Sequence, residues 1–313
     1  GYAVILAWWL TTPVTAAVNR ITVDSTGDPR NRQTYTLTAG EEVINLSSKG
    51  LGAADVNLLA VWLQRPEVIA AINSIVLDGC ALTGATKKYA RDKTFSQNID
   101  SQMDGFVALC AVLGKLERIS LANCGLGPAR AAELSKAVSS AGAGIVSINC
   151  LANKFGEEGL STLLASIKDT SVRSLCGLIE GQTVADFSGQ NLGPIDCKIM
   201  AAEFAFQGFI AAVARISVLS NPIGVEGAAA LIEVYEKNPQ IRTLLGIEEG
   251  VTEVNFSEKN VDVGQTSHRH HCRCSITPSC RMRKPTQVVP WRRSFTSTNS
   301  GGSTVGLTCG KTS

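Results

Sequence analysis

The chain has 313 residues, of which 44% are hydrophobic and 18% charged, so it can bury a core large enough for one or two domains. Its net charge of +2 conceals a division. Residues 263–313 hold six Arg, two Lys and no acidic residue, which leaves 21 basic and 27 acidic side chains in residues 1–262. Ten cysteines without regular close spacing exclude a small disulfide scaffold, and we expect reduced thiols in an intracellular, cytoplasmic protein.

The first 18 residues are apolar and could be taken for a membrane segment. However, residues 5–13 (ILAWWLTTP) align with residues 58–66 (LLAVWLQRP), and no basic residue precedes them. Pro13 also interrupts the stretch well short of the ~20 residues that a membrane-spanning helix needs. We therefore predict that this stretch is the helical half of a repeat, and we expect no membrane interaction.

A short strand recurs along residues 1–264, with alternating apolar and small polar residues. The strands are marked by their second apolar residue: Ile21, Ile44, Ile75, Ile119, Ile148, Ala185, Ile216 and Val254. Between them, residues 129–138, 158–167 and 226–235 place Leu, Ile and Ala at three- and four-residue spacing, which predicts helices. About eight strand-and-helix units follow one another, so we expect the strands to form one parallel sheet.

Some units are longer than others. Residues 174–194 and 243–263 match at eight of 21 positions, 69 residues apart, and residues 36–52 are a fainter copy. These copies predict an extra turn or hairpin that contains a Gly-Glu pair. Another interval holds a polar insertion, residues 83–104, which we expect to project from one face and to offer Tyr89, Arg91 and Phe95 to a partner.

The recurring pattern resembles the leucine-rich repeat family, in its ribonuclease-inhibitor-like subtype. The residues that carry this resemblance run from Leu116 to Gly127 (LERISLANCGLG) and from Ile145 to Gly156 (IVSINCLANKFG), with Cys or Asn at the turn. The same position holds Cys80 and Asn221 elsewhere, whereas Lys49, Gln190 and Lys259 depart from it. The resemblance implies an α/β fold, a right-handed solenoid curved as a horseshoe arc, with the parallel sheet on the concave face and the helices on the convex face.

The remaining residues, 265–313, form a basic low-complexity tail that contains all three histidines. Three interpretations stay open: a disordered tail, a sequence read in a shifted frame, or a nucleic-acid-binding segment. The tail's Cys and His lack the paired spacing of a zinc site, so we expect no metal and no cofactor. Although nucleic-acid binding stays open for the tail, a nucleic acid is not the partner that we expect for the chain.

No histidine precedes residue 268, and no nucleophile stands beside a base in a recognisable motif, so we expect no enzymatic activity. We predict a scaffold or adaptor that binds another protein through small polar residues on the exposed strand face. The candidate contacts are Asn45, Ser120, Asn149, Asp186, Ser217 and Asn255. The alternative is a small-GTPase regulator of the Ran-GTPase-activating type, which the resemblance allows but for which no catalytic residue stands out.

Overall fold

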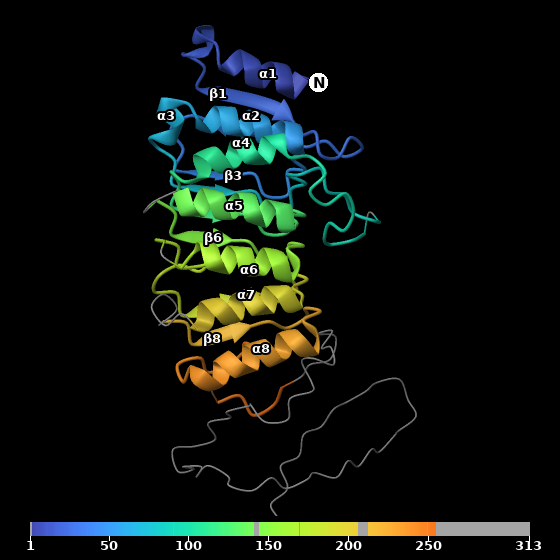
Figure 1. The fold of residues 1–313 in the computed structure, drawn as a ribbon, viewed down its shortest axis with the longest axis vertical. Helices are drawn as coiled ribbons and strands as arrows, with labels where there is room; N and C mark the ends of the chain where they lie inside the picture. Colours follow the sequence, from blue (N-terminus) through green and yellow to red (C-terminus); the bar gives the residue numbers. More distant parts are fainter. Residues whose placement is uncertain are drawn as a thin grey trace, which may run out of the picture.

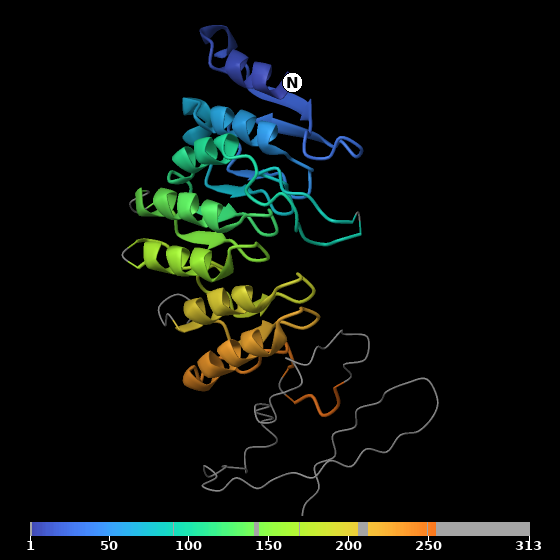
Figure 2. The same ribbon diagram turned by 45° about the vertical axis from the view of Figure 1, so that its right-hand side comes forward.

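Short strands alternate with helices along the chain, and the helices lie side by side in chain order (Figures 1 and 2). The computed structural model describes residues 2–89, 91–140, 144–168, 170–205, 212–248 and 250–254. The helices are α1 (Tyr2–Leu10), α2 (Ala53–Leu63), α3 (Pro66–Ile69), α4 (Asp104–Leu113), α5 (Pro128–Ser140), α6 (Gly156–Ser166), α7 (Pro194–Ala205) and α8 (Gly224–Lys237), with a 3-10 turn, η1, at Pro13–Thr15. The strands are β1 (Arg20–Asp24), β2 (Thr34–Thr38), β3 (Val43–Asn45), β4 (Ser74–Val76), β5 (Arg118–Ser120), β6 (Ser147–Asn149), β7 (Val184–Asp186) and β8 (Arg215–Ser217).

The parallel pairing predicted from the sequence is confirmed for β3 to β8. Strands β3, β4, β5 and β6 form one parallel sheet, in which Ile44, Ile75, Ile119 and Ile148 stand in register. Strands β7 and β8 form a second parallel pair that aligns Ala185 with Ile216. The expected α/β class with parallel strands is therefore correct, although the single continuous sheet is not, because the described strands fall into separate sheets.

The parallel pairing expected for the first strand of the series is wrong. Strand β1 contains Ile21, but it pairs antiparallel with β2, which the strand series did not include. Residues Thr34–Thr38 alternate buried and exposed, with Tyr35 and Leu37 inside, so they complete a hairpin. The last predicted strand is also wrong within the described residues, since Val254 lies outside any strand and is 45% exposed.

The longer units contain the predicted extra turn. Ser174 and Cys176 bridge to β6, and Thr243 and Leu245 bridge to β8, so each segment lies beside the preceding strand before the next unit begins. A glycine follows at the same place in all three copies: Gly40, Gly181 and Gly250 have φ of 84°, 78° and 84°. Such positive φ values favour glycine, which explains why this residue recurs in copies that otherwise diverge.

One hydrophobic core runs through the stack from Ala7 to Ile241. The middle residue of each parallel strand is buried, as Ile75 and Ile216 illustrate, and the apolar side of each helix covers it. Each such side chain contributes about 1.5–3 kcal/mol when it leaves water. No single unit could enclose these residues alone, so neighbouring units stabilise one another.

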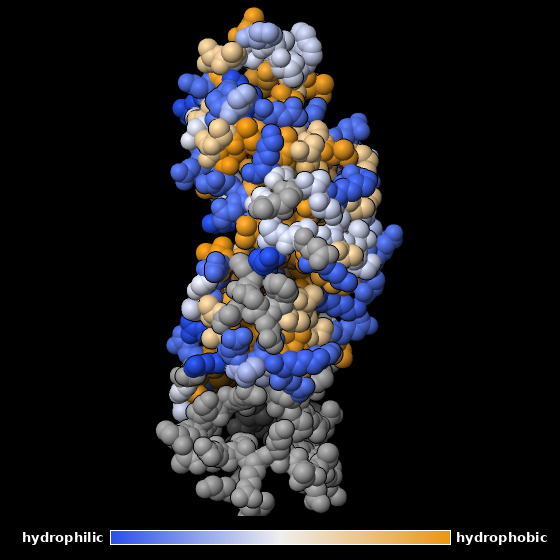
Figure 3. Space-filling view, turned by 60° about the vertical axis from the view of Figure 1, so that its left-hand side comes forward, coloured by the Kyte–Doolittle hydropathy of each residue, from blue (hydrophilic) through white to orange (hydrophobic). Residues whose placement is uncertain are grey.

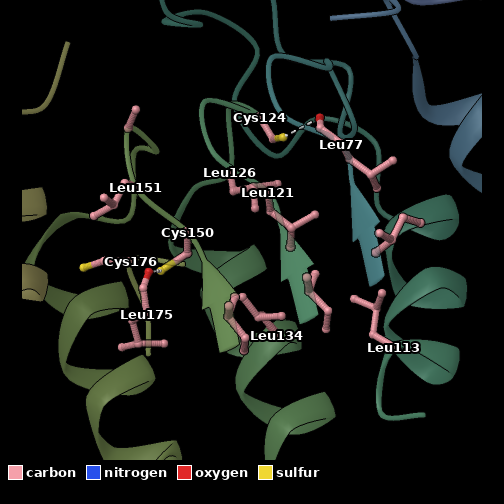
Figure 4. Close-up of a cluster of buried hydrophobic side chains, with 14 of the residues drawn as sticks. Leu77, Leu113, Leu121, Cys124, Leu126, Leu134, Cys150, Leu151, Leu175 and Cys176 are labelled. Carbon is pink, nitrogen blue, oxygen red and sulfur yellow. Dashed lines mark hydrogen bonds between the residues drawn. The ribbon is translucent and has the colours of Figure 1, made fainter. Parts of the chain in front are cut away.

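The Cys and Asn side chains at the turn satisfy backbone groups of adjacent units. At the turn position, the buried thiols of Cys80 and Cys124 donate to the carbonyls of Leu46 and Leu77, at 3.3 and 3.2 Å. Cys150, which takes the place of a strand leucine, donates to the Leu175 carbonyl at 3.3 Å; Figure 4 shows the bonds of Cys124 and Cys150. Burial raises the pKa of Cys124 well above its usual value, so the thiol stays protonated and can donate. The six described cysteines are all buried, and Cys80, Cys110, Cys124, Cys150 and Cys176 are free thiols, in line with the reduced thiols expected from the sequence.

The larger Asn side chain makes more of these bonds. The side-chain oxygen of Asn153 accepts from the N–H groups of Cys124 and Leu126, at 3.0 and 3.1 Å. Its amide nitrogen donates to the carbonyls of Leu121 and Cys150, at 2.8 and 2.9 Å. This one residue therefore fastens the β5 unit to the β6 unit.

A left-handed residue comes immediately before the Cys, Asn, Lys or Gln of each turn. The residues are Ser48, Gly79, Asn123, Ala152, Gly189 and Ser220, with φ between 52° and 73°. Most of them are not glycine, which is why the sequence pattern gave no sign of this regularity. A non-glycine residue in this conformation costs roughly 1–2 kcal/mol, so the surrounding bonds must hold the turn in place.

Helix α1 confirms that the apolar start of the chain is helical. It packs against α2 through Ala7 and Leu10, while Tyr2, Ile5 and Trp8 remain 91%, 61% and 67% exposed. Figure 3 shows hydrophobic and hydrophilic residues interspersed at the N-terminal end of the stack. None of the helices that the structure describes is both long and apolar enough to span a membrane.

Candidate functional site

The strand edge predicted to bind a partner is formed by residues that flank the buried strand centres. Asn45, Ser120 and Asn149 stand in register across β3, β5 and β6, and Val76 of β4 completes the row. Asp186 and Ser217 stand in register across β7 and β8. The structure therefore brings the described candidates together in two groups, and Asn255 lies outside the described residues.

Several of these candidates are engaged by their own loops. Ser120 donates to the Asp78 carboxylate at 2.6 Å, and the N–H of Ala122 donates to the same oxygen at 2.8 Å. Burial nevertheless raises the pKa of Asp78. Asn45 accepts from the N–H and hydroxyl of Ser47, at 3.0 and 2.8 Å. These side chains therefore shape the turns that follow the strands. Asn45 is exposed and Ser120 is half-buried, so part of their surface is still open to a partner.

The second group lines a hollow. A cavity of about 390 Å³ opens between β7, β8 and the segment that follows Thr243, and its walls are mainly polar. Asp186, Ser188, Arg215, Ser217, Leu245 and Glu248 are among the residues that line it. Hydrogen bonds from Ser188 hold the pKa of Asp186 below its usual value, so this exposed carboxylate is ionised at neutral pH.

The hollow is also lined by a charge pair that was not predicted from the sequence. Arg215 contacts Glu248 at 2.6 Å, and both side chains are exposed, at 36% and 70%. Glu248 belongs to the long unit, and it reaches β8 because Thr243 and Leu245 bridge to that strand. The match between residues 174–194 and 243–263 was the one sequence signal that both segments fold in the same way. The earlier copy bridges to β6 just as the later copy bridges to β8.

The insertion, residues 83–104, leaves the stack after β4 and folds back over the neighbouring turns (Figure 2). Tyr89 is 53% exposed and Arg91 is exposed, so both can meet a partner as predicted. The prediction that Phe95 meets a partner is wrong, because its side chain is only 7% exposed and packs with Ala81 and Ala85. An aromatic residue in a polar segment anchors the insertion here, rather than presenting its ring to a partner.

The buried acids of the stack form a separate set, whose role is structural. Asp196 accepts from the N–H groups of Ala152 and Gly193, at 2.6 and 2.8 Å, and burial raises its pKa to about 6. Glu203 accepts from Ser174, Leu175 and Cys176 at 2.7 to 2.9 Å, and burial raises its pKa as well. Both acids lie on α7 and bind backbone groups of the β6 unit and the segment that follows it, so they join adjacent units across a boundary between sheets.

In the part of the chain that the structure describes, no group of three or more His, Cys, Asp or Glu side chains is placed to hold a metal ion. The tail interpretations, including the nucleic-acid-binding segment, concern residues 265–313 and lie outside the described residues.

Comparison with models of known protein families finds no family that matches the sequence. Comparison with curated proteins likewise finds no match.

Proposed function

We propose that residues 1–264 form a leucine-rich-repeat solenoid of the ribonuclease-inhibitor-like kind, and that it serves as a non-catalytic scaffold that binds another protein. The parallel strands in register, the helices stacked in chain order and the shared core support the solenoid. The Cys and Asn bonds at the turns support the subtype, because they link each unit to its neighbour. In this arrangement the strands line the concave face of the arc.

The observation that carries the proposal is the polar hollow over β7 and β8. It is built from side chains that flank the strand centres, Asp186 and Ser217, together with the exposed pair Arg215 and Glu248. Cavities of 300–1,000 Å³ hold small molecules or parts of larger ones, and an open polar hollow of about 390 Å³ suits one or two polar side chains of a partner protein. Separate wall residues can then donate and accept hydrogen bonds.

The state of the titratable groups favours binding over catalysis. The acids with raised pKa are Asp78, Asp196 and Glu203, and none of them lines the hollow. Each accepts hydrogen bonds from backbone N–H groups of the stack. The acid that does face it, Asp186, has a lowered pKa and cannot donate a proton at neutral pH. Arg215 and Glu248 offset one another's charge at the surface. The hollow thus offers recognition groups without a poised general acid.

Photo-crosslinking from the hollow tests this proposal. A photoreactive benzoylphenylalanine is placed at Ser188, which lines the hollow, and in a control variant at Ala229, an exposed position on α8. We expect a discrete crosslinked protein from the native cell extract with the Ser188 variant, lost when Asp186→Ala and Ser217→Ala are added. The proposal is contradicted if both positions capture the same proteins, or if the two alanine substitutions leave the Ser188 product unchanged.

A further inference from the structure

The insertion carries a concentration of positive charge that differs from the rest of the described chain. We call Lys87, Lys88, Tyr89, Arg91, Asp92 and Lys93 the basic tip. Its four basic side chains are all exposed and occur within seven residues, whereas residues 1–262 as a whole carry an excess of six acidic side chains. Such a local reversal of charge attracts acidic partners and accelerates their encounter.

No carboxylate of the described residues neutralises the four cations of the basic tip. Elsewhere in the stack, cations such as Arg118, Lys136 and Lys237 lie within 3.0 Å of a carboxylate. Among the described residues, no carboxylate lies within ion-pair distance of any basic side chain of the tip. The acid within the tip, Asp92, accepts instead from the N–H of Tyr89 at 2.9 Å and so fixes the turn.

Aromatic rings lie against three of these four cations. Lys88 and Arg91 both lie over the ring of Tyr89, at 5.3 and 5.6 Å from its centre, and Lys87 lies 5.5 Å from the centre of Phe95. A cation over a ring keeps its full charge and gives up part of its freedom, so less entropy is lost when it meets an anion. The tip thus presents a partly ordered set of cations.

The base of the insertion is fastened to the stack. Thr86 and Gln97 exchange two backbone bonds of 2.8 and 3.0 Å, and Asn123 donates to the Lys93 carbonyl at 2.8 Å. Fully buried Arg130 donates to the Gln102 carbonyl at 2.7 Å and pairs with Asp100. These contacts give the tip a rigid support on the β5 unit.

We infer that the basic tip is a docking surface for a short acidic segment of a partner protein, rich in Asp or Glu. The inference rests on the proposed function in that the segment belongs to the protein that the scaffold binds. A nucleic acid fits less well, because bases need free aromatic faces, while the ring of Tyr89 is covered by two cations and Phe95 is buried. The acidic stack around the tip also repels a long polyanion, whereas a short segment needs the tip alone.

Carbodiimide crosslinking of an octaglutamate peptide to the full chain tests the inference, since this reagent joins carboxylates to lysine amines within contact distance. Mapping by mass spectrometry separates the tip from the basic residues after residue 262. In 50 mM salt we expect Lys87, Lys88 and Lys93 to be modified at least tenfold more than exposed Lys115 and Lys168. In the Lys88→Glu/Arg91→Glu variant, we expect the yield at Lys93 to fall at least tenfold.

The matched control is Lys115→Glu/Lys168→Glu, which changes the net charge equally and should leave the yield at Lys93 unaltered. Modification of Lys93 no greater than that of Lys115, or an equal yield in both double variants, would overturn the inference. So would displacement of the peptide from Lys93 by a dodecathymidylate at lower concentration than by unlabelled peptide. None of these results depends on the crosslinks from Ser188, so failure of the docking surface and failure of the scaffold proposal are distinguishable.

Discussion

Replacing Asn153 with alanine tests how the units are joined. The side chain is buried and links the β5 and β6 units through bonds to Cys124, Leu126 and Leu121. Alanine removes all of them and leaves the N–H groups of Cys124 and Leu126 without this partner, in residues that are fully buried. Each buried donor that loses its bond costs about 1–3 kcal/mol.

We expect the free energy of unfolding to fall by about 3 kcal/mol, because water can enter the polar space that the amide leaves and satisfy part of it. Urea denaturation followed by circular dichroism measures this change. Asn45→Ala is the control, since Asn45 is exposed and bonds only within its own turn, and its loss should stay within about 0.5 kcal/mol. Asn153→Cys should fall between the two, because a thiol fills this position in other units. A loss below about 1 kcal/mol for Asn153→Ala would mean that the bonds of Asn153 do not hold the two units together.

Three further changes probe other parts of the stack. Asp196 binds protons more tightly in the folded chain, with a pKa of about 6 against an ordinary 3.8, so its contribution to stability is largest at low pH and is lost as pH rises through about 6. Relative to Asp196→Asn, the native chain should therefore lose about 2 kcal/mol between pH 4 and pH 7 in urea denaturation; a constant difference would contradict this. Arg130→Ala should cost about 3 kcal/mol and speed tryptic cleavage at the basic tip, because it breaks a buried pair at the base of the insertion; an unchanged cleavage rate would contradict the anchoring. Ser48→Gly should add about 0.5–1 kcal/mol to the free energy of unfolding and so raise the melting temperature. The reason is that exposed Ser48 has a φ of 56°, a conformation that glycine adopts freely, and a lower melting temperature would argue against strain there.

The periodic parts of the fold could be predicted from the sequence. Alternation around Ile75, Ile119 and Ile148 was enough to place the strands and their buried centres, because a two-residue period fixes which side chain enters the core. The hairpin of β1 and β2 was missed because its second strand interrupts the expected order of strand and helix. A repeat of one strand and one helix does not predict an antiparallel strand in the segment that links two units.

The candidate site could be predicted only in part. Asp186 and Ser217 were found because they flank strand centres, whereas Glu248 was missed because its approach to Arg215 depends on how the long unit folds back. Phe95 was misassigned, since a lone aromatic in a polar segment gives no sign of whether its ring points outward or toward Ala81 and Ala85. Both outcomes depend on how a segment folds back on its neighbours, which no local pattern of residues encodes.

If the hollow over β7 and β8 receives a protein partner, a change in the hollow must alter the affinity of the partner captured from Ser188. Its dissociation constant is measured for the native chain, for Ser188→Arg, which fills the hollow, and for Ala229→Arg on α8. We predict that Ser188→Arg weakens binding at least tenfold, whereas Ala229→Arg stays within twofold of the native chain. Equal affinities for all three chains, or a larger loss from Ala229→Arg, would contradict the claim.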